Sequence, residues 1–348
     1  MSSVKWQYVF VVFERKDNSY SYLYEFLSTL KKMEKEGTKD SSVHLLHHYE
    51  DEPNCKIITY YGGALNIVTK AFTPFHGEEV GNFIKNCKSL VPSPIYSGFV
   101  LYCHGNGWFY RHNEKRQAFS NLLVGFKKYK WDIFLLESCY CSTLEIAYEV
   151  KDVVHYLVTS ECSRSSFPTF NSSSFALCDK CDPKQMAYHL ADLYIKRCNM
   201  IPLEDQLILP PVGDIVVIDC TKIDPYLKFL ATQSINNLPL NSYKNAKLKP
   251  NKKDWNRNYD VYTALASVLG GNDLVAFRGL QDSLVVYYRQ TEQLKSKRYS
   301  KRFNGIAWCP VPWDSKSGWT YKYMTCYAIS PTLLYKGEIL SDLREEDI

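Results

Sequence analysis

A histidine and a cysteine each follow an apolar segment of this sequence, His104 after residues 99–103 and Cys139 shortly after residues 133–136. Short apolar runs of this kind predict buried strands. In open α/β sheets, functional side chains gather in the loops that follow the carboxyl ends of strands. We therefore expect His104 and Cys139 to lie at one edge of a sheet.

These two residue types suit nucleophilic catalysis. A cysteine nucleophile requires a thiolate or a base that generates one, and backbone donors must hold the oxyanion that forms on the substrate. Gly105 lets the backbone approach a substrate carbonyl closely. A helix is predicted after Cys139, with Ser142 and Glu145 as a capping box, and its dipole would favour a thiolate. By spacing alone, however, a cysteine and a histidine at strand ends are more often buried bystanders than a catalytic pair.

The elements that must position these residues alternate along the chain. Short apolar runs separated by helical patterns are typical of an α/β fold with a mainly parallel sheet. Besides the two strands above, the patterns predict strands at 6–13, 43–46, 56–61, 156–159 and 214–218, and helices at 20–36, 183–198, near 260–270 and at 280–295. A surface loop is expected at 163–174, a polar linker at 240–258 and a strand region rich in Pro and Trp at 305–328.

Composition excludes several classes of protein. Apolar residues make up 45% and charged residues 23%, which is the balance of a globular chain rather than a disordered one. The net charge of +5 does not call for a nucleic-acid partner, and we expect none. No apolar run approaches the roughly 18–20 residues of a membrane span. The twelve cysteines are irregularly spaced and no secretory signal precedes them, so we expect free thiols and a cytoplasmic location.

Two longer segments resemble the clostripain family of cysteine peptidases. The apolar run at 99–103 followed by His104-Gly105-Asn106-Gly107-Trp108 is similar to that family's His-Gly-x-Gly-Trp motif. Residues 132–139, with 143–149 and 156–161, resemble its nucleophile strand and the helix and strand that follow. Segments at 6–13, 217–223 and 304–307 resemble further core strands, so the resemblance extends over most of the chain.

The resemblance implies a caspase-like fold: a doubly wound, mainly parallel sheet with helices on both faces, followed by a C-terminal extension. It also implies a cysteine endopeptidase acting on polypeptides, with His104 as base, Cys139 as nucleophile and no third catalytic residue. The N–H groups of Gly105 and Cys139 would form the oxyanion hole, and Glu137 and Glu161 are the expected substrate-binding residues. Some family members use calcium, but this sequence has no dedicated calcium loop, so we expect no cofactor and no metal site, with calcium suggested by the resemblance alone.

The sequence departs from the family pattern in three ways. Glu137 stands where the family has an Asp that selects a basic residue at P1, the substrate position before the cleaved bond; a preference for Arg or Lys is therefore an open hypothesis. The loop at 162–168 lacks the usual Gly, Trp and acidic residues, so the pocket wall is expected to differ. Only 34 residues separate His104 from Cys139, which favours a single chain without maturation cleavage, although 115–116 and 127–128 are basic pairs.

The runner-up function is a catalytically weak or inactive member of the fold that serves as a structural or interaction component. The altered loop and the 27 tyrosines fit that interpretation, and the composition, which suggests an AT-rich genome, is compatible with a virion or assembly protein of a large DNA virus. The basic stretch 295–302 and the tryptophans at 308, 313 and 319 are candidates for a surface that binds protein partners. Cys178 and Cys181 are interpreted as structural rather than as zinc ligands. We expect a peptidase core at 1–235 and a C-terminal subdomain at 236–348 packed on it.

Overall fold

The structure is a computed structural model of the 348-residue chain. It describes residues 4–15, 21–50, 52–72, 77–106, 109–112, 115–162, 164, 169–178, 180–200, 213–233, 259–297, 301 and 303–308. The sequence-predicted linker at 240–258 lies outside these residues, as does the whole region after 308. None of the helices within the described ranges is both long enough and apolar enough to cross a membrane.

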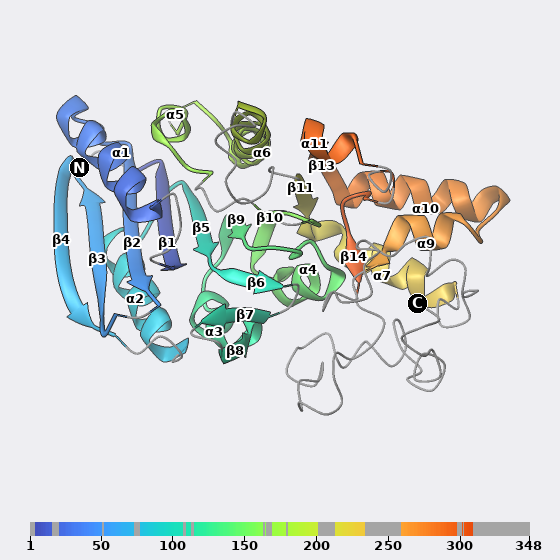
Figure 1. Cartoon of the computed structure of the whole chain (residues 1–348), viewed down its shortest axis with the longest axis horizontal. Helices are drawn as coiled ribbons and strands as arrows, with labels where there is room; N and C mark the ends of the chain where they lie inside the picture. The colour runs from blue at the N-terminus through green and yellow to red at the C-terminus, as the bar shows by residue number, and fades with distance from the viewer. Residues whose placement is uncertain are drawn as a thin grey trace.

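A large sheet runs through the described part of the molecule (Figure 1). Its strand order is β13-β11-β10-β9-β5-β1-β2-β3-β4. The five central strands, from β10 to β2, are parallel, and the strands added at both edges are antiparallel. The strands are β1 (Trp6–Glu14), β2 (Ser41–Tyr49), β3 (Asn54–Tyr61), β4 (Ala64–Ala71), β5 (Tyr96–Tyr102), β9 (Trp131–Glu137), β10 (Val154–Thr159), β11 (Asp214–Asp219) and β13 (Val285–Gln290).

Helices cover both faces of this sheet, each facing its own apolar core. On one face, α1 (Tyr22–Glu36), α5 (Ser172–Phe175) and α6 (Pro183–Met200) pack on alternate strand residues such as Phe10. On the other face lie α2 (Gly77–Leu90), α3 (Phe119–Phe126), α4 (Leu144–Val150), α7 (Ile223–Thr232), α9 (Val261–Ala266) and α10 (Gly271–Leu284). Successive side chains of a strand point to opposite faces, and both faces are covered by helices. The central strands are therefore buried on both sides, and their sequences are continuous apolar runs. This arrangement confirms the predicted fold class.

The remaining described elements are short. A three-stranded hairpin sheet of β6 (His104–Asn106), β7 (Phe109–His112) and β8 (Lys115–Ala118) follows β5. Near the end of the described chain, α11 (Glu292–Lys295) follows β13, and β12 (Tyr259–Asp260) pairs with β14 (Ala307–Trp308). The sequence patterns did not predict β4, α2, α3, α7 or this hairpin sheet.

The prediction of one helix over 280–295 is wrong. Helix α10 ends at Leu284, and the next six residues form β13, which pairs antiparallel with β11. Val285, Val286, Tyr287 and Tyr288 are β-branched or aromatic, types that favour a half-buried strand once a neighbouring edge is available. Residues after 258 thus contribute a strand to the central sheet, and the domain boundary at 235 stays a prediction.

Candidate active site

His104 and Cys139 follow neighbouring parallel strands. Tyr102, the last residue of β5, is paired with Glu137, the last residue of β9. His104 and Cys139 each come two residues later, beyond the carboxyl ends of strands that lie about 4.8 Å apart. The N–H of Cys103 extends this pairing by donating to the carbonyl of Glu137 at 3.4 Å. The structure thus places both residues just beyond the carboxyl ends of two central strands, as the sequence predicts.

Cys139 is partly exposed and lies against a loop residue. The backbone N–H of Arg164 donates to the Sγ of Cys139 at 3.3 Å, and the thiol lies 3.9 Å from the carbonyl oxygen of the same arginine. Tyr140, directly after the cysteine, has a φ of 56°. Non-glycine residues rarely adopt this conformation, and it concentrates at functional sites. His104 is exposed.

The neighbouring thiols differ from Cys139 in burial. Of the cysteines that the structure describes, Cys139 and Cys181 are partly exposed and the others are buried. Burial raises the pKa of Cys103 and of Cys141 well above the ordinary thiol value, which keeps both protonated. Cys141 donates its S–H to the carbonyl of Cys139 at 3.3 Å.

The helix after the cysteine begins later than predicted. Its N-cap is Thr143, whose hydroxyl accepts from Ile146 N–H at 3.3 Å, so the predicted capping box at Ser142 is wrong. The Ser142 hydroxyl donates instead to the Gly305 carbonyl at 2.5 Å. The field of a helix dipole is confined to its terminal turn, and Cys139 lies well before the first turn of α4. The expected dipole support for a thiolate is therefore weak.

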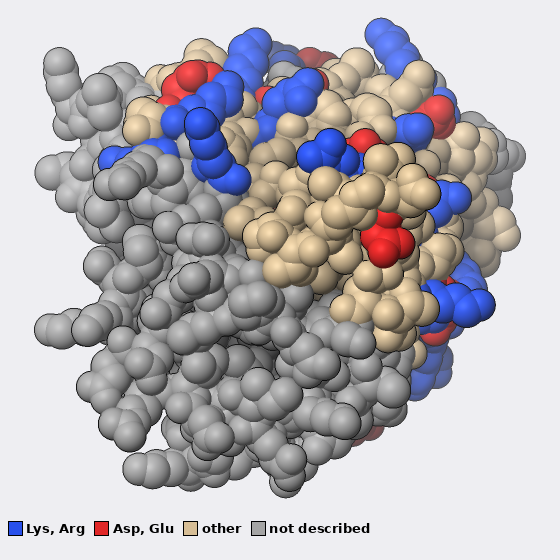
Figure 2. Space-filling model, turned by 90° about the vertical axis from the view of Figure 1, so that its right-hand side faces the viewer, with Lys and Arg blue, Asp and Glu red and all other residues tan. Residues whose placement is uncertain are grey.

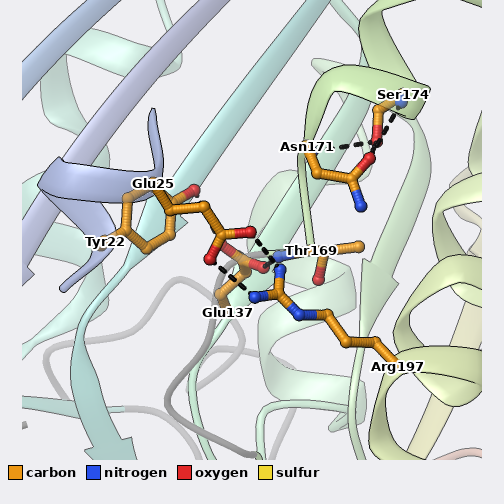
Figure 3. Close-up of polar contacts among 7 residues, drawn as sticks. All are labelled: Tyr22, Glu25, Glu137, Thr169, Asn171, Ser174 and Arg197. Atoms are coloured by element: carbon orange, nitrogen blue, oxygen red, sulfur yellow. Dashed lines mark hydrogen bonds and ion pairs between the residues drawn. The ribbon is translucent and has the colours of Figure 1, made fainter. Parts of the chain in front are cut away.

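The carboxylate of Glu137, the expected P1-binding residue, is occupied within the chain. Its Oε1 accepts from the guanidinium of Arg164 at 3.0 Å and from the N–H of Thr169 at 2.7 Å. Its Oε2 accepts from the Tyr22 hydroxyl at 3.0 Å. Figure 3 shows Tyr22 of α1 and Thr169 near Glu137. The Glu137 side chain is 0% exposed, so its charge is balanced within the protein.

Arg164 provides that balancing charge. Its side chain is 2% exposed, contacts the Thr169 hydroxyl through Nη2 and stacks on the Tyr194 ring of α6 at 4.1 Å. Burial by itself lowers the pKa of an arginine, but the charge of Glu137 reverses this and the pKa of Arg164 is raised. In the part of the chain that the structure describes, its Nε and Nη1 have no hydrogen-bond partner.

Tyr22 is held in position from both ends. Its N–H donates at 2.7 Å to Glu14, whose other oxygen lies 2.7 Å from His47 Nε2 in a buried pair. Its hydroxyl donates to Glu137, and the charge of that carboxylate adds to burial in raising the pKa of the tyrosine. Nearby, Arg197 of α6 pairs with Glu25 of α1 (Figure 3). Helix α1 is therefore linked by Tyr22 to Glu137 and by Glu25 to α6.

Glu161, the second expected substrate-binding residue, is completely buried. Its Oε2 accepts from the N–H of Gly305 at 2.8 Å. Burial, and then the charges of Asp260 and Asp214, raise the pKa of this carboxyl group well above its usual value. These contacts tie the end of β10 to the turn before β14. No part of the side chain faces solvent, so the structure shows no surface of Glu161 that a substrate could contact. A role in substrate binding stays a prediction.

Gly105 lies in β6, buried and opposite Tyr110 of β7. Gly107 and Trp108, the last two residues of the recognised motif, lie outside the described residues. The role of the Gly105 and Cys139 N–H groups as oxyanion donors stays a prediction.

Sequence reasoning missed the partners of the expected site residues. Arg164 was visible only as the single basic residue in the altered loop, and nothing in its local pattern connects it with Glu137. The partners of Glu161 are likewise remote: Gly305 lies 144 positions away along the chain. Only folding brings these groups together.

No cluster of three or more His, Cys, Asp or Glu side chains that could hold a metal ion occurs among the described residues. Cys178 is buried and donates to the Tyr8 hydroxyl at 3.6 Å, as a packed thiol would. Calcium and the absence of a cofactor both stay predictions.

The expected partner surface can be followed only in part. Figure 2 views the side that carries α9, α10 and α11, where basic and acidic groups are interspersed over the described atoms. Lys295 pairs with Glu292 at 2.7 Å, as an ordinary solvated pair would. Trp308 is buried, at 1% exposure, and packs in the core rather than at a surface. Trp313 and Trp319 lie outside the described residues, and binding of protein partners stays a prediction.

Comparison of sequences finds no matching family model and no matching curated protein. Comparison of structures finds clear similarity. A secreted C11 cysteine protease from Bacteroides thetaiotaomicron superposes with a TM-score of 0.70 at 18% identity, covering 95% of this chain and 98% of that one. An inactive zymogen C11 protease from Parabacteroides distasonis gives 0.66 at 17% identity, with the same coverage.

A secreted C11 cysteine protease from Bacteroides thetaiotaomicron in complex with an irreversible peptide inhibitor gives a TM-score of 0.66 at 15% identity, covering 93% of this chain and 98% of that one. At these identities the similarity establishes the fold. The chain has the caspase-like fold of C11 cysteine proteases, the clostripain family, which confirms the fold that the sequence resemblance implied.

Proposed function

We propose that the protein is a clostripain-like cysteine endopeptidase that hydrolyses polypeptides with His104 and Cys139. One observation carries the proposal: these two residues follow adjacent parallel strands at the carboxyl edge of a sheet that has the fold of C11 proteases. The partial exposure of Cys139, beside thiols that burial keeps protonated, supports its assignment as the nucleophile.

The proposed reaction follows from the chemistry of the two side chains. His104 takes the proton of the Cys139 thiol, and the sulfur attacks the carbonyl carbon of the scissile bond. The N–H groups of Gly105 and Cys139 donate to the oxygen that becomes negative. His104 then returns the proton to the leaving amine as the C–N bond breaks and a thioester forms. Water, deprotonated by the same histidine, hydrolyses the thioester and releases the free enzyme.

The resemblance also implies a preference for Arg or Lys at P1 through Glu137. This part stays a prediction with a condition attached. Glu137 already forms an ion pair with Arg164, so a basic side chain of a substrate could pair with its carboxylate only after that arginine had moved away.

Turnover of short fluorogenic peptides with Arg, Lys, Asp or Asn at P1, under reducing conditions, tests the proposal. We expect Cys139→Ala to lower kcat by about 10³-fold or more, and His104→Ala to lower it by about 10²–10⁴-fold. Cys141→Ala is the matched control, because it removes a neighbouring buried thiol, and it should retain activity. Circular dichroism checks that each variant folds.

Absence of turnover with every peptide, together with no labelling of Cys139 by a peptidyl electrophile, would contradict the proposal. Those results would favour the structural or interaction role instead.

A further inference from the structure

We propose that Arg164 is a specificity-determining residue of this site: it cancels the charge of Glu137 and excludes basic side chains from P1. The peptidase would then cleave after residues without a positive charge. The inference rests on the proposed function and defines its substrate class.

The first support is the state of the Glu137 carboxylate. It accepts three hydrogen bonds, from Arg164, Thr169 and Tyr22, and a carboxylate offers about four such sites. With a 0% exposed side chain, it has neither the uncompensated charge nor the accessible surface needed to bind an incoming cation. Glu137 therefore acts as a positioning residue for Arg164 rather than as an acidic pocket floor.

The second support is the contact of Arg164 with the nucleophile. Its backbone N–H is 3.3 Å from the sulfur of Cys139, while its side chain reaches Glu137, two residues before that cysteine. Arg164 thus contacts the Cys139 sulfur with its backbone and also contributes the positive charge that pairs with Glu137. A substrate bound to Cys139 must place its P1 residue close to Arg164.

The third support is the permanence of the cation. The guanidinium is enclosed by Glu137, Thr169 and the ring of Tyr194, and the charge of Glu137 keeps it protonated. Displacing it would leave a buried arginine without its counter-ion, which is strongly unfavourable. Two of its donors, Nε and Nη1, lack partners among the described residues, so the arginine has unused capacity to donate to a hydrogen-bond acceptor.

Peptides that differ in charge but not in shape test the inference directly. Arginine and citrulline at P1 have nearly the same shape, and only arginine is charged. We expect the wild-type protein to cleave the citrulline peptide with a kcat/KM at least about tenfold higher than the arginine peptide, since no uncompensated carboxylate remains to offset the desolvation of a charged P1 side chain.

A charge series at the pair sharpens the test. Arg164→Gln leaves Glu137 uncompensated and should reverse the ratio in favour of arginine. Glu137→Gln leaves Arg164 uncompensated and should shift cleavage toward Asp over Asn at P1 by about tenfold. The double variant restores neutrality and should return the wild-type ratio. Arg197→Gln, which breaks the ion pair between Arg197 of α6 and Glu25 of α1, is the control for loss of a partly buried ion pair and should leave the ratio unchanged.

The outcomes separate failure of the specificity inference from failure of the proposed peptidase function. A wild-type preference for arginine over citrulline overturns the inference and leaves the peptidase intact, and this measurement needs no variant to fold. Wild-type protein that cleaves nothing while Arg164→Gln cleaves the arginine peptide overturns it too, because Arg164 would then be an internal blocker. If no variant cleaves any peptide and a peptidyl electrophile does not label Cys139, the proposed function itself has failed.

Discussion

Individual cysteines in this protein differ sharply in accessibility. Cys103 and Cys141 surround the proposed nucleophile but are buried, and burial raises the pKa of each, so neither supplies a thiolate at neutral pH. Cys139 has the same chemistry and a different environment: the residue is partly exposed, and its sulfur accepts from the N–H of Arg164. Residue type was visible in the sequence, whereas the environment that separates these thiols was not.

We expect iodoacetamide to modify Cys139 in the native protein at least about tenfold faster than Cys103 or Cys141, because only exposed thiols react readily. Peptide mass spectrometry after short exposure measures the difference. Cys181, the other partly exposed cysteine that the structure describes, is the internal reference for plain accessibility. Labelling of Cys141 as fast as Cys139 would contradict the assignment, and unfolded protein should show no such selectivity.

Among the secondary-structure elements, the turn before β14 connects the C-terminal elements to the site. Gly305 has a φ of 101° and donates its N–H to Glu161, while its carbonyl accepts from the Ser142 hydroxyl. Ala307 N–H donates to the carbonyl of Ser142, so the turn is fastened to the segment that follows Cys139. Residues late in the chain thus support the loop that carries the proposed nucleophile.

We expect Gly305→Ala to lower the free energy of unfolding by about 2–3 kcal/mol, since it forces both overpacking and an unfavourable backbone angle. A Cβ at this position would lie 2.7 Å from Cγ1 of Val285. Urea unfolding measures the loss. Gly279→Ala is the matched control: it lies within α10 with no atom near the new Cβ, and should stabilise by about 0.5–1 kcal/mol. Equal stability of both variants would contradict the role of the turn.

Two features that involve several elements affect properties of the whole molecule, its stability as a function of pH and its integrity as one polypeptide. One is the burial of three carboxyl groups, Asp214, Glu161 and Asp260, where β10, β11 and the C-terminal elements meet. The other is the single, short connection between the two proposed catalytic residues.

The buried carboxyl groups make stability depend on pH. Burial raises the pKa of Asp214 from 3.8 to about 6, so the folded protein binds this proton more tightly than the unfolded chain does. The stability contributed by Asp214 is therefore complete below about pH 4 and is lost as the pH rises through about 6. A difference of this size corresponds to about 3 kcal/mol.

Asp214→Asn tests this, because the remaining oxygen can still accept from Ser160 and from the N–H of Cys162. Between about pH 4 and about pH 8, wild-type melting temperature should fall relative to that of the variant. Asp224→Asn is the control, since that carboxylate is exposed and pairs with Lys151 at the surface. Parallel pH profiles for wild type and Asp214→Asn would exclude the effect.

We expect the active protein to remain one polypeptide. Lys127, in one of the two basic pairs between His104 and Cys139, forms an ion pair with the buried Glu149 of α4, which holds that segment in the fold. A denaturing gel of active protein should show a single band. Two fragments that disappear in Cys139→Ala would demonstrate self-cleavage instead.

Local sequence patterns were enough to predict the central strands and several of the helices, in the correct order along the chain. The apolar run 6–13 predicts a buried strand, and the structure has β1 at Trp6–Glu14; the helical pattern of 20–36 with Gly37 as a stop predicts an amphipathic helix, and the structure has α1 at Tyr22–Glu36. The strand ends at His104 and Cys139 follow from the same local patterns. These features depend on neighbours a few residues apart, so periodicity records them.

The surroundings of His104 and Cys139 depend on contacts between segments that are far apart in the chain. The tertiary structure paired Glu137 with Arg164, buried Glu161 beside Asp260, and turned 285–290 into a strand against β11. Each partner comes from a distant part of the chain or from a loop without periodicity. The charge at such a site depends on which groups folding brings within a few ångströms and removes from water, and local sequence patterns do not encode that proximity.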